Sequence, residues 1–190
     1  YYITPSRHAA VVQQEIIESV SAACRGMGLC EGPVHAEVRI GASGCVIIEV
    51  ASRTIGGECA RLLNFGTGRT LEELVIAHAL GEALDLDVPV DAAGVLMIPI
   101  RTGGILRRIE GMTAARAVDF IEEILISIRD GYELVPLPEG SSYLGFMFAR
   151  APTAQQVEAA LRAAHQQLNI VVSPLLKLED QRQSQEEVSG

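Results

Sequence analysis

Residues 34–51 read VHAEVRIGASGCVIIEVA, and their pattern predicts local structure clearly. Apolar residues alternate with polar ones on both sides of a turn, GASG at residues 41–44. Such alternation is typical of strands with one buried face, so the stretch predicts a β-hairpin. If Gly41 pairs with Cys45, a three-residue loop closes the hairpin and Glu37 stands directly opposite Glu49. Other registers of matching parity place the two glutamates diagonally on the same face.

Helices flank the predicted hairpin. Upstream, the spacing of apolar residues predicts a helix that Ser6 caps and that presents one inward stripe, formed by Val12, Ile16, Val20, Cys24 and Met27. Downstream, a short helix is expected over residues 58–65. The capping-box pair Thr70 and Glu73 predicts another helix over residues 71–83.

The second half of the chain consists mostly of predicted strands. A linker is expected over residues 85–93, and a strand at residues 95–100 is expected to pair with residues 105–109 across the turn Gly103–Gly104. Further strands are expected at residues 123–128, 143–149 and 170–172. Thr153 caps a last helix, whose inward residues are Val157, Leu161, Ala164 and Leu168.

This order of elements predicts an α+β protein. We expect a first domain over residues 1–90, a second, smaller and mostly β domain over residues 91–175, and a polar tail over residues 176–190. The chain length of 190 residues is compatible with one large domain or two small ones.

The amino-acid composition excludes some classes of partner and indicates a cellular location. The net charge is −9 and no basic cluster occurs, so we expect no nucleic-acid partner. The apolar runs are too short to span a bilayer, and the four cysteines without a C-x-x-C pair indicate reduced thiols in a cytoplasmic protein. The chain begins with Tyr1, and its only lysine is Lys177. Because enzymes that handle ATP usually carry lysines or a glycine-rich loop beside the phosphates, we expect a fragment of a longer protein.

Glu37 and Glu49 are the most informative residues. Regular alternation puts both on one face of the hairpin, opposite the face that carries Val46, Ile48 and Val50. Directly opposed side chains lie about 5 Å apart at Cβ, where like charges are destabilising. A divalent cation would remove the repulsion, and Mg²⁺ takes carboxylate oxygens while it shares substrate phosphates. The alternative is a solvated face on which the acids bind nothing.

Residues near the glutamates fit a phosphate, metal and carboxylate site. His35 lies on the same strand face as Glu37, and Arg53 continues the strand of the second glutamate. Gly56–Gly57 follow, where exposed backbone N–H groups can meet an anion. Each feature also has a plain structural interpretation, since Arg53 can form a surface ion pair and the glycines can simply turn the chain.

Two segments, GPVHAE at residues 32–37 and IIEVASRTIGG at residues 47–57, resemble the end of an ATP-grasp catalytic domain. The resemblance is to the amino-acid ligase branch, and it covers residues 1–85, including the helix junction Thr67–Gly68. Residues 92–172 are similar to the small C-terminal domain of that branch. The resemblance implies the C-terminal lobe of an ATP-grasp domain, built of antiparallel strands with helices, followed by a small, mostly β C-terminal domain.

In such enzymes, two glutamates on adjacent strands hold Mg²⁺ against the ATP phosphates. The resemblance therefore implies that Glu37 and Glu49 bind Mg²⁺ or Mn²⁺, with ATP as co-substrate. The implied reaction is that of an ATP-dependent ligase, which joins a small carboxylate to an amine through an acyl phosphate. N-terminal lobes upstream of Tyr1 would hold the rest of the ATP site, so this chain alone is expected to be inactive.

The resemblance also implies roles for the neighbours of the glutamates. Arg53 is the implied catalytic residue, which would hold the substrate carboxylate or the acyl phosphate, and His35, Gly56 and Gly57 would complete the substrate site. Other interpretations stay open at this point. The chain can be a non-catalytic dimerisation or regulatory module, or a biotin-carboxylase-like or glycinamide-ligase-like ATP-grasp relative, and a homodimer is a further open alternative.

Overall fold

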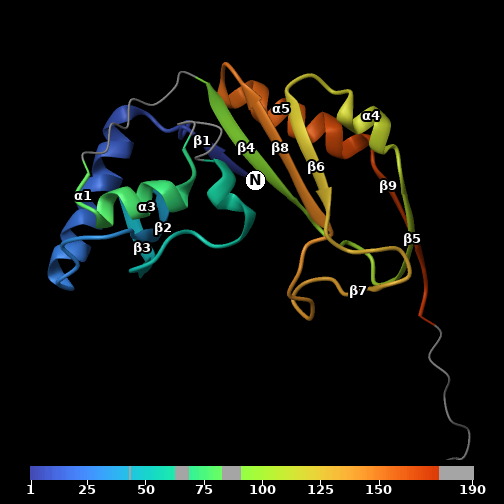
Figure 1. Ribbon diagram of the computed structural model, residues 1–190, viewed down its shortest axis with the longest axis horizontal. Helices are drawn as coiled ribbons and strands as arrows, with labels where there is room; N and C mark the ends of the chain where they lie inside the picture. The colour runs from blue at the N-terminus through green and yellow to red at the C-terminus, as the bar shows by residue number, and fades with distance from the viewer. Residues whose placement is uncertain (43, 63–68, 83–90, 176–190) are drawn as a thin grey trace, which may run out of the picture.

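The computed structural model describes residues 1–42, 44–62, 69–82 and 91–175. Within these ranges the elements are β1 (Tyr2–Thr4), α1 (Ala10–Gly26), β2 (His35–Gly41), β3 (Gly44–Ala51), the 3-10 helix η1 (Gly57–Ala60), α3 (Leu71–Ala79), β4 (Ala92–Ile98), β5 (Gly104–Glu110), α4 (Met112–Arg116), β6 (Ile121–Ile126), β7 (Glu133–Leu134), β8 (Gly145–Ala151), α5 (Ala154–Gln167) and β9 (Asn169–Ser173). Antiparallel strands with a few helices confirm the α+β class (Figure 1). None of the described helices has the length and apolar character that crossing a membrane requires.

The predicted hairpin is present, but its register differs from the regular one. Gly41 pairs with Gly44 rather than with Cys45, so the turn is shorter than expected. A β-bulge then shifts the register between Val38, which pairs with Ile47, and Glu37, which pairs with Glu49. The extra residue of a bulge re-aims the side chains that follow it. The direct opposition of Glu37 and Glu49 is therefore confirmed, through a short turn and a bulge that compensate each other.

The short turn reverses which residues of β3 face inward as far as Ile47, and the bulge restores the expected facing from Glu49 on. Cys45, Ile47 and Val50 are half-buried on the side where α1 packs, whereas Val46 and Ile48 are 55% and 63% exposed. The prediction that Val46 and Ile48 share a buried face with Val50 is wrong, because regular alternation does not hold across a bulge. Helix α1 covers this hairpin with its predicted stripe, of which only Met27 is exposed.

A four-stranded sheet in the order β1-β4-β8-β6 forms the centre of the protein (Figure 1). Strand β4 is buried on both faces, which explains its nearly continuous apolar sequence. One face packs against helix α5 through Leu96, Ile98, Met147, Val157, Leu161 and Ala164. The other face packs against the segment around η1 through Cys59, Leu62, Ala93, Val95 and Phe148.

Pairing between distant strands departs from the prediction. Residues 105–109 do not pair with the preceding strand, since β5 pairs with β7 and β9 in a separate three-stranded sheet. Strand β4 instead pairs with β8 and with β1 at the start of the chain. It begins at Ala92, inside the predicted linker over residues 85–93. Strand β1 thus joins the first predicted domain to the sheet of the second, and the division at residue 90 stays a prediction.

Two of the three predicted helix N-caps are confirmed. Thr70 accepts a hydrogen bond from Glu73 N at 3.1 Å while Glu73 accepts one from Thr70 N at 2.8 Å, and Thr153 accepts one from Gln156 N at 3.3 Å. Ser6 is not a cap, because α1 begins only at Ala10 and the Ser6 hydroxyl accepts a hydrogen bond from His8 N. The helix junction at Thr67–Gly68, part of the predicted helix over residues 58–65 and the tail over residues 176–190 lie outside the described residues.

Arg61 joins the segment after η1 to the central sheet. Its guanidinium pairs with Glu123 on β6, lies 3.3 Å from Glu58, and stacks over the Phe148 ring on β8 at 4.4 Å from the centroid. Burial lowers the pKa of Arg61, but the hydrogen bonds with Glu123 and Glu58 outweigh it and raise the pKa above its ordinary value. One side chain thereby connects the chain that follows the hairpin to two strands of the sheet.

We expect Arg61→Ala to lower the free energy of unfolding by about 1–2 kcal/mol, from the cation–π contact and the partly buried ion pairs together. Urea denaturation followed by far-UV circular dichroism measures this loss. Arg129→Ala, which removes an exposed arginine outside this contact, serves as the control and should change stability by less than about 0.5 kcal/mol. Equal losses in both variants would show that Arg61 does not secure the segment.

Candidate functional site

The predicted metal site is an exposed acidic pair on the outer face of the hairpin. Glu37 and Glu49 are Cα partners across β2 and β3, and their side chains are 49% and 47% exposed. The bulge at Ile48 directs the side chain of Glu49 to the same face of the hairpin as that of Glu37. Like charges at directly opposed strand positions cost roughly 0.2–1 kcal/mol, so the pair does not serve the stability of the hairpin.

Each glutamate has one cationic or titratable neighbour, as the sequence predicted. Arg53 Nη2 donates to Glu49 Oε1 at 3.4 Å, and Arg53 Nη1 donates to the Thr54 carbonyl at 3.0 Å. His35 Nε2 lies 3.3 Å from Glu37 Oε1, and the His35 side chain is only 15% exposed. The structure therefore brings Arg53 and His35 to the acidic pair, one on each side. Their roles toward a substrate stay predictions.

The acidic pair fits a hard divalent cation in its chemistry. Carboxylate oxygens are the ligands that Mg²⁺ prefers, and Mg²⁺ keeps several waters while it uses only one or two carboxylates. Among the described residues, no group of three or more His, Cys, Asp or Glu side chains forms a complete metal cage. A site of two carboxylates is therefore suited to a cation that brings its remaining ligands with it, as substrate phosphates and water.

The charge of Glu37 influences Tyr2, a link that the sequence did not indicate. Burial raises its pKa above the ordinary value, and the charges of Cys59, Glu37 and Tyr143 raise it further. The phenol therefore stays protonated at neutral pH and can donate a hydrogen bond. Tyr2 lies on β1, and a three-residue strand has no periodicity by which the sequence could reveal it.

The predicted glycine pair lies at the start of η1. Gly56 is the N-cap of this short helix, with φ −85° and ψ 171°, and an added Cβ there would meet open space. An acid, Glu58, occupies the first turn and pairs with Arg61. Open space beside Gly56 is compatible with a bound substrate, and the role of Gly56 and Gly57 in substrate binding stays a prediction.

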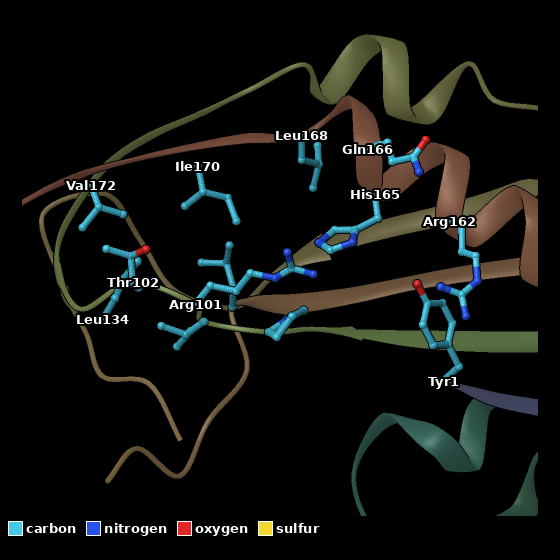
Figure 2. Close-up of a pocket in the computed structure, with 13 residues that line it drawn as sticks. Tyr1, Arg101, Thr102, Leu134, Arg162, His165, Gln166, Leu168, Ile170 and Val172 are labelled. Carbon is cyan, nitrogen blue, oxygen red and sulfur yellow. The ribbon is translucent and has the colours of Figure 1, made fainter. Parts of the chain in front are cut away.

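A second feature, which we name the C-terminal cavity, was also missed by the sequence. It has a volume of about 510 Å³ and is lined by Arg101, Arg162 and His165 together with apolar residues (Figure 2). Its lining residues come from Tyr1 and from residues 99–172, and the acidic pair contributes none of them. No motif marks such a site, because its basic residues are brought together only by the fold.

Two family models match the sequence, and together they cover most of it. Residues 1–61 match the ATP-grasp domain, and residues 96–173 match the L-amino acid ligase C-terminal domain 2. Among curated proteins, the uncharacterized protein y4rH of Sinorhizobium fredii is 25% identical over 171 residues, which are 90% of this chain and 36% of that protein. The acidic pair and its neighbours lie within the first matched segment, and the C-terminal cavity lies almost entirely within the second.

Solved structures agree with these matches. The L-amino acid ligase of Bacillus licheniformis is similar at a TM-score of 0.79 and 26% identity, over 90% of this chain and 44% of that one. The phosphoribosylglycinamide synthetase of Anaerococcus prevotii is similar at a TM-score of 0.73 and 18% identity, again over 90% and 44%. This chain therefore spans less than half the length of each of these proteins.

Proposed function

Because this chain belongs to the ATP-grasp superfamily and corresponds to the C-terminal part of L-amino acid ligase-like proteins, we propose that it supplies the metal-binding carboxylates of an ATP-dependent carboxylate–amine ligase. The observation that carries the proposal is the direct opposition of Glu37 and Glu49 on an exposed strand face. A protein gains no stability from this arrangement, whereas a bound cation would make it favourable.

The surroundings of the acidic pair support a covered site in the intact protein. Val46 and Ile48, 55% and 63% exposed, stand on the face that carries the two glutamates. Exposed apolar residues beside convergent charges are typical of a surface that contacts a ligand or another part of a protein. N-terminal lobes of a longer parent, together with ATP, would supply this cover.

In the proposed mechanism, Glu37 and Glu49 would hold Mg²⁺ or Mn²⁺, which would neutralise charge on the phosphates of ATP. Arg53 would leave Glu49 and place its guanidinium on the carboxylate or acyl phosphate of the substrate, which planar N–H donors bind well. His35 would keep Glu37 oriented through the contact already present at 3.3 Å. The substrate carboxylate would attack the γ-phosphorus of ATP, which forms the acyl phosphate and releases ADP. An amine would then attack the acyl carbon and displace phosphate, which gives the amide once the amine nitrogen has lost a proton to solvent.

The proposal includes the partners and the location of the protein. ATP, a small carboxylate and an amine are the proposed substrates, and a cytoplasmic location is compatible with the free cysteines of the described residues. Homodimerisation stays a prediction. Similarity to a phosphoribosylglycinamide synthetase, at 18% identity, concerns the fold and favours no particular acceptor.

The test is to trap, with hydroxylamine, the acyl phosphate that the intact parent protein forms. We expect ADP formation to require Mg²⁺ and one member of a panel of L-amino acids, and added hydroxylamine to yield the corresponding hydroxamate. The readouts are coupled ADP detection and the coloured iron complex of the hydroxamate. ADP formation that needs no carboxylate, or that yields no hydroxamate with any amino acid in the panel, would argue against an amino-acid ligase.

A further inference from the structure

The C-terminal cavity has the size of a small-molecule site. It lies where the turn between β4 and β5, the last turns of α5 and strand β9 meet (Figure 2). Its volume of about 510 Å³ falls within the range of roughly 300–1,000 Å³ that is usual for ligand pockets. Apolar side chains, among them Leu134, Leu168 and Ile170, form much of its wall.

The charged side chains that line the cavity are basic, and none of its lining residues is an Asp or Glu. One of them, Arg162, is already compensated. Its Nη2 donates to Glu158 Oε1 at 2.7 Å, and its guanidinium carbon lies 4.6 Å from the centroid of the Tyr1 ring. Arg162 therefore closes one end of the cavity without leaving an excess charge there.

Arg101 differs from Arg162. Its guanidinium points toward the ring of His165 across the cavity (Figure 2), and within the described ranges no carboxylate forms an ion pair with it. Burial lowers the pKa of His165, and the charge of Arg101 lowers it further, so the imidazole is neutral at pH 7. Arg101 is exposed to solvent, and its positive charge borders a cavity of mixed polar and apolar lining without a counter-ion among the described residues.

A structural role for Arg101 at the end of α5 is the competing interpretation. The last turn of a helix carries partial negative charge, which favours a nearby cation. Such a role would explain the charge of Arg101, but not the cavity beside it. It also predicts that loss of Arg101 changes stability alone, which separates the two interpretations by experiment.

We propose that the C-terminal cavity binds a small organic carboxylate with an apolar body, whose carboxylate accepts hydrogen bonds from the guanidinium of Arg101. The apolar body would lie against Leu168 and Ile170, and His165 would offer a further polar contact. The planar guanidinium matches a carboxylate in a bidentate geometry, so this ligand class suits the site better than a spherical anion. The proposal does not depend on the proposed ligase function, since the acidic pair contributes nothing to the cavity.

Hexanoate and hexanamide are the probes, because they share an apolar body and differ in charge. We expect hexanoate to bind the full 190-residue chain saturably and to shift the methyl resonances of Leu168, Ile170 and Val172 in NMR spectra. Hexanamide should bind roughly 10- to 100-fold more weakly, as is typical when a hydrogen bond to a charged group is lost. Equal binding of the two probes, or shifts confined to other residues, would overturn the proposal.

Arg101→Gln is the matched variant, and Arg129→Gln is the control with an exposed arginine outside the cavity. We expect Arg101→Gln to weaken hexanoate binding roughly 10- to 100-fold while hexanamide binding stays unchanged, which also shows that the cavity is intact. Arg129→Gln should change neither. Undiminished hexanoate binding by Arg101→Gln would overturn the proposal. A lowered melting temperature in this variant, with no hexanoate binding by the unaltered chain, would assign Arg101 to the end of α5 instead.

Discussion

Glu49→Gln in the intact parent protein is expected to lower the rate of ATP-dependent ligation by about 100- to 1,000-fold, the loss that typically follows removal of one preorganised electrostatic group from an active site. Glutamine keeps the size of the side chain and one oxygen, but it lacks the charge that a divalent cation needs. The Mg²⁺ concentration for half-maximal rate should rise together with the loss of rate. Steady-state ADP formation over a Mg²⁺ titration measures both.

Stability provides a second readout for the same variant. Because Glu49 stands opposite Glu37 and also pairs with Arg53, its neutralisation removes a repulsion of roughly 0.2–1 kcal/mol together with an exposed ion pair of similar size, and should leave the stability of the metal-free protein nearly unchanged. A variant that loses activity without losing stability marks the acid as a ligand rather than as part of the scaffold. The control is Glu133→Gln, on an exposed strand position of β7, which should change neither quantity.

An unchanged ligation rate in Glu49→Gln would contradict the proposed metal site. It would leave the acids as an inert feature of the hairpin and favour a dimerisation or regulatory module. Electron paramagnetic resonance measures the binding of Mn²⁺ to the purified chain. It distinguishes a variant that no longer binds the metal from one that binds it in an unproductive position. We expect the variant to bind Mn²⁺ more weakly than the unaltered chain.

Gly111→Ala is expected to destabilise the fold by about 3 kcal/mol or more, the sum of a left-handed backbone penalty and a steric clash. Gly111 adopts φ +83° between β5 and α4, and a Cβ added there would lie 1.9 Å from the Gln167 carbonyl oxygen at the end of α5. The backbone at Gly111 and the backbone at Gln167 cannot move apart without separating α4 from α5. Chemical denaturation of the purified chain measures the loss.

Gly131→Ala isolates the backbone part of this effect. Gly131 has nearly the same φ, +88°, but an added Cβ there would meet no atom within 4 Å. We therefore expect a loss of only about 1–2 kcal/mol from the left-handed conformation alone. If the two alanine variants lose the same stability, then the clash at Gly111 is relieved by a shift of the chain and the close approach of α5 does not matter.

The elements that the sequence predicted correctly are those set by short-range physics. The capping box of Thr70 and Glu73, the N-cap Thr153 and the inward stripe of α5 all depend on residues within one or two turns of each other. Direct opposition of Glu37 and Glu49 was one of the registers that the sequence allowed, and it assumed a turn one residue longer than the observed one. The opposition is nevertheless present because the bulge restores the register at the far end of the hairpin.

Long-range pairing could not be predicted in this way. The pattern of residues 105–109 indicates a strand, but nothing in it selects β7 and β9 as partners over β4. Strand β1 is ordered by its pairing with β4 rather than by its own sequence, so Tyr2 could not be linked to Glu37 beforehand. The C-terminal cavity was missed for the same reason, since Arg101 and His165 meet only once the sheet and helix are assembled.

The bulge at Ile48 also has an evolutionary consequence. A hairpin with a turn one residue longer and no bulge would bring Glu37 opposite Glu49 just as the observed one does. Insertions and deletions at the tip can therefore be absorbed along β3 before they reach the acids. The two hairpins differ in which apolar side chains face α1. Relatives with a different turn length should therefore carry their apolar residues at the other alternate positions among residues 45–48, while both glutamates are retained.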